Sequence, residues 1–358
     1  MAHAGTNLRT NYLEANEVLP RPYQKLLTAL ILAAALVLPG GASGYFLHLM
    51  NLCFLACISA LGLMILTGFC GQISLGHAAF LAIGAFTTVI LTVHLKLPFI
   101  IVVPAAAVSG AAVGFFVGLP SLRFRGVYLA ISTLAMHYAI IFVCTSYQAN
   151  FGSSASAGIT IDDPAIGPFR LRGEHAWYYF LLVLLTLVTV GCVNLIRTRS
   201  GRAWMAIRDR DIAAEALGIN LTRYKLSAFM LSATLASVSG SLAAYYSNVV
   251  TVEGYTLDLA VIYVAMIIVG GMGSILGGLL GAIFITLLPY GIDRIFEFLP
   301  RAWRFGSTAF GVQVGAVGVC IILFLLFEPK GLAELWRRAE TYFDRWPFRY
   351  RPLDTTRR

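Results

Sequence analysis

Charged side chains are scarce in this chain of 358 residues. Asp, Glu, Lys and Arg make up only 12% of it, whereas 58% is hydrophobic. Soluble domains are about 25% charged, so this composition argues against a water-soluble globule. None of the four charged residue types occurs between 26 and 95, and further uncharged runs cover 97–122, 126–161, 175–196, 226–252 and 305–327. A helix needs about 20 apolar residues to cross a bilayer, so we predict an all-α, polytopic integral membrane protein.

Sequence motifs that carry chemistry are also missing. The chain has no GxxxxGK[ST] phosphate loop, no HExxH and no GxSxG. Its six cysteines form no CxxC pair and lie in or beside apolar segments, as buried thiols commonly do. We therefore expect no catalytic residue, no metal site and no cofactor in this chain, which would not be an enzyme.

The formal net charge of +9 raises the question of nucleic acid, but its distribution argues against that partner. The positive residues gather in loops and tails beside the apolar segments, which is typical of cytoplasmic loops. We expect membrane lipids as partners and no nucleic acid.

The apolar segments predict about ten transmembrane helices. The region 257–292 is too long for one span at about 1.5 Å per residue, and the glycines of "VGGMGSILGG" divide it. The first run is short, so eight or nine spans remain possible. The expected spans are 27–38, 45–67, 73–94, 99–119, 126–147, 176–196, 226–247, 257–271, 275–292 and 306–327.

Loop charges predict the orientation. Arg123 and Arg125 share one short loop, the segment 197–225 holds seven Lys or Arg against three acids, and the tail after Glu328 is rich in arginine. With ten spans these regions share one side, which the positive-inside rule assigns to the cytoplasm. Arg294, together with arginines 301 and 304, is the exception. We expect a cytoplasmic segment 1–25, a transmembrane domain 26–330 and a basic cytoplasmic tail 331–358, with both termini cytoplasmic.

The longest charged loop, 197–225, contains a predicted amphipathic helix. Its apolar stripe is Ala203, Ile207, Ala214 and Leu217, and Gly218 occupies the position of a helix C-cap. Such a helix could dock against a partner protein or lie on lipid head groups. The residues alone leave both interpretations open.

This loop, "GRAWMAIRDRDIAAEALGIN", resembles the coupling loop of ABC importer permeases, and more narrowly that of branched-chain amino-acid permeases. The blocks "GFCGQISLGHAAFLAIGA", "LPSLRFRGVYLAISTL", "IIVGGMGSILGGLLGA" and "FEPKGL" are similar to the same family and occur in its order. The arrangement resembles the larger, M-type permease. Two segments depart from the family pattern: the outer loop reads "NFGSSASAGITI", and "STLAMHYAIIF" has His137 and Tyr138 where a glutamate is common.

The resemblance implies a permease subunit of an ATP-driven importer for branched-chain or related small amino acids, in a bacterial inner membrane. It implies ABC ATPase subunits that carry ATP and Mg²⁺, a second, H-type permease and a periplasmic or lipid-anchored solute-binding protein. A passive channel or a secondary transporter for a small neutral solute is the alternative. The coupling residues that it implies are Gly201, Arg202, Ala203, Arg208, Asp209, Asp211, Glu215, Ala216 and Gly218.

Glycines and polar residues interrupt the apolar stretch "GFCGQISLGHAAF", Gly68–Phe80. A broken helix is tolerated in lipid only where protein or a water-filled cavity satisfies its backbone. This segment therefore either frames the solute path or packs closely against other helices. For the second glycine cluster, 270–281, packing is favoured. The candidate path residues are Gly71, Gln72, Ser74, Gly76, His77, Thr133 and His137.

Overall fold

The computed structural model describes residues 22–121, 124, 126–151, 158–166, 169–298 and 331–345, with scattered positions between 311 and 328. Within these residues eight helical segments are long and apolar enough to cross a membrane. The only strands there are four of two residues each. The predicted all-α, polytopic membrane fold is confirmed.

The long helices follow the uncharged runs of the sequence. They are α3 (Gly44–Leu63), α4 (His77–Val89), α5 (Phe99–Ser121), α6 (Val127–Phe151), α7 (Glu174–Arg197), α10 (Leu221–Ser247), α11 (Leu257–Gly270) and α12 (Ile275–Phe298). The π-helical turns η2 (Met64–Phe69) and η3 (Ile90–His94) extend α3 and α4, and the 3-10 turn η4 (Val252–Tyr255) precedes α11. The remaining helices are α2 (Pro22–Val37), η1 (Leu38–Gly40), α8 (Arg199–Asp209), α9 (Asp211–Ala216) and α14 (Leu332–Arg345).

Eight of the ten expected spans coincide with these helices. The expected span 27–38 falls mainly within α2, whose 16 residues are fewer than a crossing needs. Most of the expected span 306–327 lies outside the described residues. The predicted division of 257–292 is confirmed: α11 ends at Gly270 and α12 begins at Ile275. Between them Gly271 and Gly273 have φ of 106° and 82°, which side chains with a Cβ rarely adopt.

The centre of the bundle is packed through small residues. α10 lies against α3, α4 and α5, and its Gly240 is so close to α4 that an added Cβ would lie 2.0 Å from the Leu81 carbonyl oxygen. Gly84 of α4 approaches the backbone of Ser237 in the same way. Helices in membranes associate through such close approaches because lipid offers little hydrophobic driving force.

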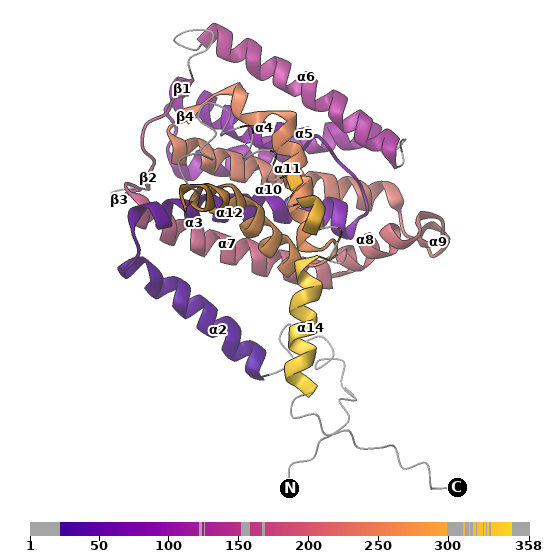
Figure 1. Cartoon of the computed structure of the whole chain (residues 1–358). Helices are drawn as coiled ribbons and strands as arrows, with labels where there is room; N and C mark the ends of the chain where they lie inside the picture. Colours follow the sequence, from indigo (N-terminus) through magenta and orange to yellow (C-terminus); the bar gives the residue numbers. More distant parts are fainter. Residues whose placement is uncertain are drawn as a thin grey trace, which may run out of the picture.

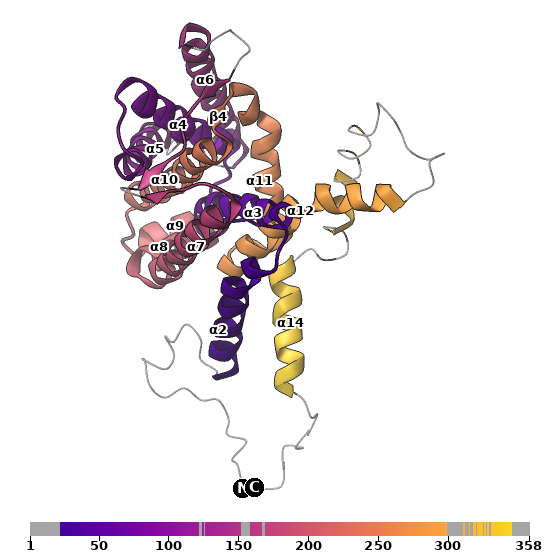
Figure 2. The same ribbon diagram turned by 90° about the vertical axis from the view of Figure 1, so that its left-hand side faces the viewer.

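The bundle has two distinct ends (Figure 1). The long helices α6, α7 and α10 run across the view, with α8 and α9 at one end and the strands at the other. At the strand end β1 (Ile159–Thr160) pairs antiparallel with β4 (Val249–Val250), and β2 (Ala165–Ile166) pairs with β3 (Phe169–Arg170). Helices α2 and α14 extend away from the bundle (Figure 2). We call the two ends the α8–α9 end and the strand end.

Candidate functional site: a coupling segment and a cavity at opposite ends

The segment predicted as one helix over 203–217 is two helices. Arg210 has an extended backbone, with φ of −158° and ψ of 110°, and it separates α8 from α9. Asp211 then supplies a negative charge in the first turn of α9, where the helix dipole favours it. Because the break changes the direction of α9 relative to α8, an apolar stripe predicted for one continuous helix does not continue from α8 into α9.

The predicted apolar stripe is accordingly only partly correct. Ala203, Ile207 and Ala214 are buried, but Leu217 is 80% exposed. Gly218 has φ of 83°, which agrees with the left-handed C-cap expected from the sequence. Leu217 is therefore available to a partner rather than to the bundle.

Three contacts hold α8 and α9 against the membrane helices. The buried Trp204 donates from Nε1 to the Tyr224 carbonyl oxygen of α10 at 2.9 Å. The Lys225 ammonium of α10 lies 2.7 Å from an Asp211 carboxylate oxygen, with the Lys225 side chain only 11% exposed. Gly201 allows α8 to approach the end of α7, because a Cβ at this position would lie only 2.0 Å from the Ile196 carbonyl oxygen. These contacts anchor the inner face of the segment to α7 and α10.

A further anchor, Arg208, reaches the interrupted stretch that follows α3. Its Nη1 donates to the Gly68 carbonyl oxygen in η2 at 3.0 Å. A Cβ on Gly71 would lie 3.2 Å from the Arg208 Cα, and a Cβ on Gly273 would lie 2.6 Å from its Nη1. The two interruptions predicted from the sequence therefore meet at one arginine of the predicted coupling segment.

The other predicted coupling residues lie at the exposed surface of this segment. Glu215, Ala216 and Gly218 are exposed. Arg202 donates to the Arg197 carbonyl oxygen at 2.7 Å, and Asp209 pairs with Arg208 at 3.2 Å.

Two large apolar side chains that the sequence analysis did not single out as exposed flank Glu215. Ile212 is 75% exposed and Leu217 80% exposed. The sequence alone does not distinguish these two positions from others of an amphipathic helix. Because of the break at Arg210, both side chains face away from the bundle.

Except for Gly71, which is exposed, the predicted path residues are buried against protein. His77 lies 2.8 Å from Ser59 Oγ through Nε2, and its ring meets the Tyr263 ring edge-on at a centroid distance of 5.2 Å. Thr133 Oγ1 accepts from the Leu75 amide at 3.0 Å, and a Cβ on Gly76 would lie 2.8 Å from the Thr133 carbonyl oxygen. Close packing against α3, α6 and α11 thus accounts for these positions; their contact with solute stays a prediction.

Three further path candidates, Gln72, Ser74 and His137, are also buried. Ser74 Oγ accepts from the Gly76 amide at 3.3 Å. Gln72 Oε1 and His137 Nδ1 have no hydrogen-bond partner among the described residues. Water or a solute that reached either atom would supply the hydrogen bond that the described residues do not.

A cavity of about 580 Å³ opens toward the strand end, and none of the predicted path residues lines it. Tyr263, which packs on His77, is the link between the two regions. The cavity is mainly apolar with a few hydroxyls; its walls come from α3, α4, α10, α11 and α12, and they include Leu55, Met266, Ser239, Thr286, Tyr263 and Tyr290. Sequence reasoning missed it because its lining residues form no motif.

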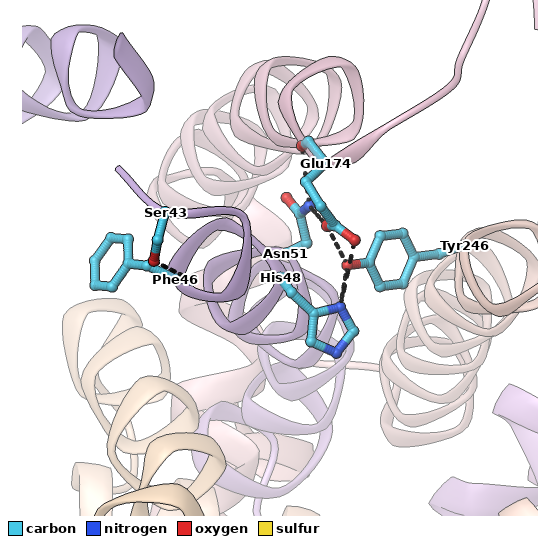
Figure 3. Close-up of polar contacts among 6 residues, drawn as sticks. All are labelled: Ser43, Phe46, His48, Asn51, Glu174 and Tyr246. Carbon is cyan, nitrogen blue, oxygen red and sulfur yellow. Dashed lines mark hydrogen bonds and ion pairs between the residues drawn. The ribbon is translucent and has the colours of Figure 1, made fainter. Parts of the chain in front are cut away.

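Beside this cavity, a polar cluster ties three helices together at the strand end (Figure 3). Glu174, the first residue of α7, accepts hydrogen bonds from the Tyr246 hydroxyl of α10 at 2.6 Å and from Asn51 Nδ2 of α3 at 2.9 Å. His48 Nδ1 lies 2.6 Å from the same Tyr246 hydroxyl. Because Asn51 is fully buried, the carboxylate satisfies a donor that water does not reach.

Comparison with known proteins identifies the family. Residues 45–325 match the family described as branched-chain amino acid transport system, permease component. The chain is 32% identical to the high-affinity branched-chain amino acid transport system permease protein LivM of Escherichia coli (strain K12), over 88% of this chain and 76% of that protein. No solved structure matches the chain.

More distant relatives include permeases that are named for other solutes. A probable branched-chain amino acid permease, LivM of Methanocaldococcus jannaschii, is 24% identical over 65% of this chain and 67% of its own length. The ribose import permease protein RbsC of Escherichia coli (strain K12) is 28% identical over 55% of this chain and 62% of its own length. The chain belongs to the branched-chain amino acid permease family and is a multi-pass protein of the plasma membrane.

Proposed function

We propose that this chain is the permease subunit of an ATP-driven importer for branched-chain or related small amino acids. The similarity to a high-affinity branched-chain amino acid permease supports the solute class. Hydrolysis is supplied in trans by ABC ATPase subunits that bind ATP and Mg²⁺. A second permease and a solute-binding protein complete the importer, and both termini of this chain lie in the cytoplasm.

The ATPase docks on the exposed surface of α9. Ile212 and Leu217 are 75% and 80% exposed, and the exposed Glu215 lies between them in sequence. Burying a large aliphatic side chain contributes about 1.5–3 kcal/mol, so these two residues supply the apolar part of the contact. Glu215 adds a charge that pairs with a basic group of the ATPase.

The observation that carries the coupling proposal is the 3.0 Å hydrogen bond from Arg208 to the Gly68 carbonyl oxygen. A displacement of α8 by the ATPase pulls directly on η2 and on the residues that lead into α4. Trp204 and Lys225 transmit the same displacement to α10, which lies at the centre of the bundle. The coupling segment therefore acts on the helices that enclose the cavity.

The cavity at the strand end holds the solute in the outward-open state. Its volume of about 580 Å³ lies in the range of small-molecule sites, about 300–1,000 Å³. Apolar walls with a few hydroxyls suit an aliphatic side chain. Closure of the strand end and opening of the α8–α9 end complete the cycle.

The proposal is tested with Ile212→Asp and Leu217→Asp in the complete transporter, by co-purification of the ATPase and by ATP-driven leucine uptake. Both variants should lose ATPase binding and uptake together, because each places a charge in the docking surface. Thr222→Asp is the matched control: it adds the same charge at an exposed position in the first turn of α10, where the helix dipole favours an acid. Undiminished uptake without bound ATPase would instead identify a passive channel or a secondary transporter.

A further inference from the structure

Helix α14, at the end of the described part of the chain, has one apolar face and one charged face. Its large apolar residues and one alanine recur at the spacing of a single helical face. These residues, which we call the α14 stripe, are in sequence Leu332, Leu335, Trp336, Ala339, Tyr342 and Phe343. Between them lie Glu334, Arg337 and Arg338. A helix of this composition needs an apolar surface against its stripe.

The bundle covers the beginning of the α14 stripe. Leu332 packs against a hydrophobic cluster of membrane-spanning helices that includes Val269 of α11 and Ala282 of α12. Farther along the helix, Leu335 is 41% and Trp336 43% exposed. Because these residues share a face with Leu332, the stripe faces the side of the membrane helices rather than the side away from them. The surface that it meets next to the bundle therefore lies at the level of the membrane.

The start of α14 is fixed at the α8–α9 end. Gly331 approaches the turn between α11 and α12 so closely that a Cβ there would lie 2.5 Å from the Gly271 amide nitrogen, and Gly273 of the same turn approaches Arg208. From this point α14 crosses the direction of the long spans: α6, α7 and α10 run across the view of Figure 1, whereas α14 runs down the view in both Figure 1 and Figure 2. A helix that crosses the direction of the spans lies in the plane of the membrane.

The charge of this segment matches that of the cytoplasmic membrane surface. Loop charges assign the α8–α9 end to the cytoplasm, and residues 331–358 contain seven arginines against four acids. Arg337 pairs with Glu334 at 2.9 Å and Arg338 with Glu328 at 3.0 Å, so the attraction comes from the excess of positive charge over the whole segment and not from an unpaired arginine. Such an excess is attracted by the anionic lipids of the cytoplasmic leaflet.

We propose that α14 binds the anionic cytoplasmic leaflet of the membrane, with its stripe at the boundary between head groups and acyl chains. Amphipathic helices with Trp and Leu on one face and arginine on the other bind membranes in this way, and Trp favours the level of the head groups. Because α14 begins on the turn that reaches Arg208, this contact holds the turn beside the coupling segment. The inference goes beyond import and does not depend on the solute.

Spin labels on the two faces of α14 test this binding without requiring transport. Leu335→Cys places a label on the stripe, with Ala339→Cys as a second site on the same face if the first variant folds poorly. Arg337→Cys is the matched control, because residues two positions apart lie on different faces of a helix and the Arg337 side chain is 70% exposed. The five described native cysteines are buried, and the labelled transporter without an added cysteine gives the background.

The complete transporter is reconstituted in liposomes of phosphatidylethanolamine and anionic phosphatidylglycerol, and electron paramagnetic resonance measures the collision of each label with oxygen and with a water-soluble nickel chelate. Oxygen concentrates in hydrocarbon, whereas the chelate stays in water. The ratio of oxygen to nickel accessibility should be several-fold higher for the label at 335 than for the label at 337. In liposomes of zwitterionic phosphatidylcholine alone, nickel accessibility at 335 should rise, because the basic segment loses its anionic surface.

Three results would overturn the inference. A label at 335 that is protected from both oxygen and nickel would show that a protein surface, the ATPase or the second permease, covers the stripe. A label at 335 that is as open to nickel as the label at 337 would place the stripe in water. Equal accessibility in the anionic and the zwitterionic liposomes would exclude the recognition of anionic lipid. Loss of leucine uptake with the predicted label pattern intact would contradict the import function alone.

Discussion

The Arg208 guanidinium donates a 3.0 Å hydrogen bond to the carbonyl oxygen of Gly68, 140 positions away in the sequence. This bond joins the charged segment between α7 and α10 to the π-helical turn that ends the first long span. Gly71 and Gly273 approach the same arginine so closely that neither position accommodates a Cβ without displacement. The helix-weakening glycines of both clusters thus leave room for one cationic side chain.

Close approach between α4 and α10 predicts a contrast between two glycine substitutions. Gly240→Ala should lower the free energy of unfolding by about 1–3 kcal/mol, because overpacking forces the two helices apart. Gly191→Ala in α7 is the matched control, since a Cβ there meets nothing within 4 Å, and alanine should be neutral or stabilising by up to about 1 kcal/mol. Thermal unfolding of the detergent-solubilised protein measures both. Equal effects would contradict the packing role of Gly240.

The carboxylate of Glu174 is predicted to stabilise the strand end. Glu174→Ala removes the carboxylate that accepts from Tyr246 and from Asn51 Nδ2, while Asn51 Nδ2 keeps its bond to the backbone carbonyl of residue 174. A buried donor hydrogen that is left unsatisfied costs about 1–3 kcal/mol. Glu174→Gln keeps one carbonyl oxygen and should cost less. Glu253→Gln is the control, because Glu253 is exposed at the same end. Unchanged thermal stability of Glu174→Ala would show that the cluster contributes nothing.

Substitution of His77 should act on both stability and solute affinity. His77→Ala removes the contact with Ser59 and the edge-on support of Tyr263, and Tyr263 lines the apolar cavity. We therefore expect a lower unfolding temperature together with a raised half-saturating leucine concentration. His94→Ala is the matched control, because His94 is exposed and does not line the apolar cavity. Full uptake with unchanged affinity in His77→Ala would exclude a role in the path.

The sequence predicted the helical framework well, for a physical reason. Bilayer thickness fixes how long an uncharged run must be, so eight span positions and the division near Gly271 follow from composition alone. The break at Arg210 did not follow, because the segment 203–217 consists largely of helix formers. Its cause is tertiary: Trp204 and Ala214 are both buried against the bundle, and the two short helices must turn relative to one another to achieve this.

The apolar cavity was harder to predict than the helices. Its lining residues are single aliphatic, hydroxyl and tyrosine side chains contributed by several helices, so no local pattern marks them. The predicted path residue His77 lies one side chain away from the apolar cavity, behind Tyr263.

The most direct test of the coupling mechanism is Arg208→Ala in proteoliposomes that contain the complete transporter, with ATPase retention, ATP hydrolysis and leucine uptake measured on the same sample. We predict that the ATPase stays bound and hydrolyses ATP, whereas uptake falls roughly 5- to 150-fold, the range of typical coupling free energies. Arg208→Lys should be intermediate, because lysine keeps the charge without the planar fork. Normal uptake by Arg208→Ala, with unchanged thermal stability, would contradict the transmission of movement through the Arg208–Gly68 hydrogen bond.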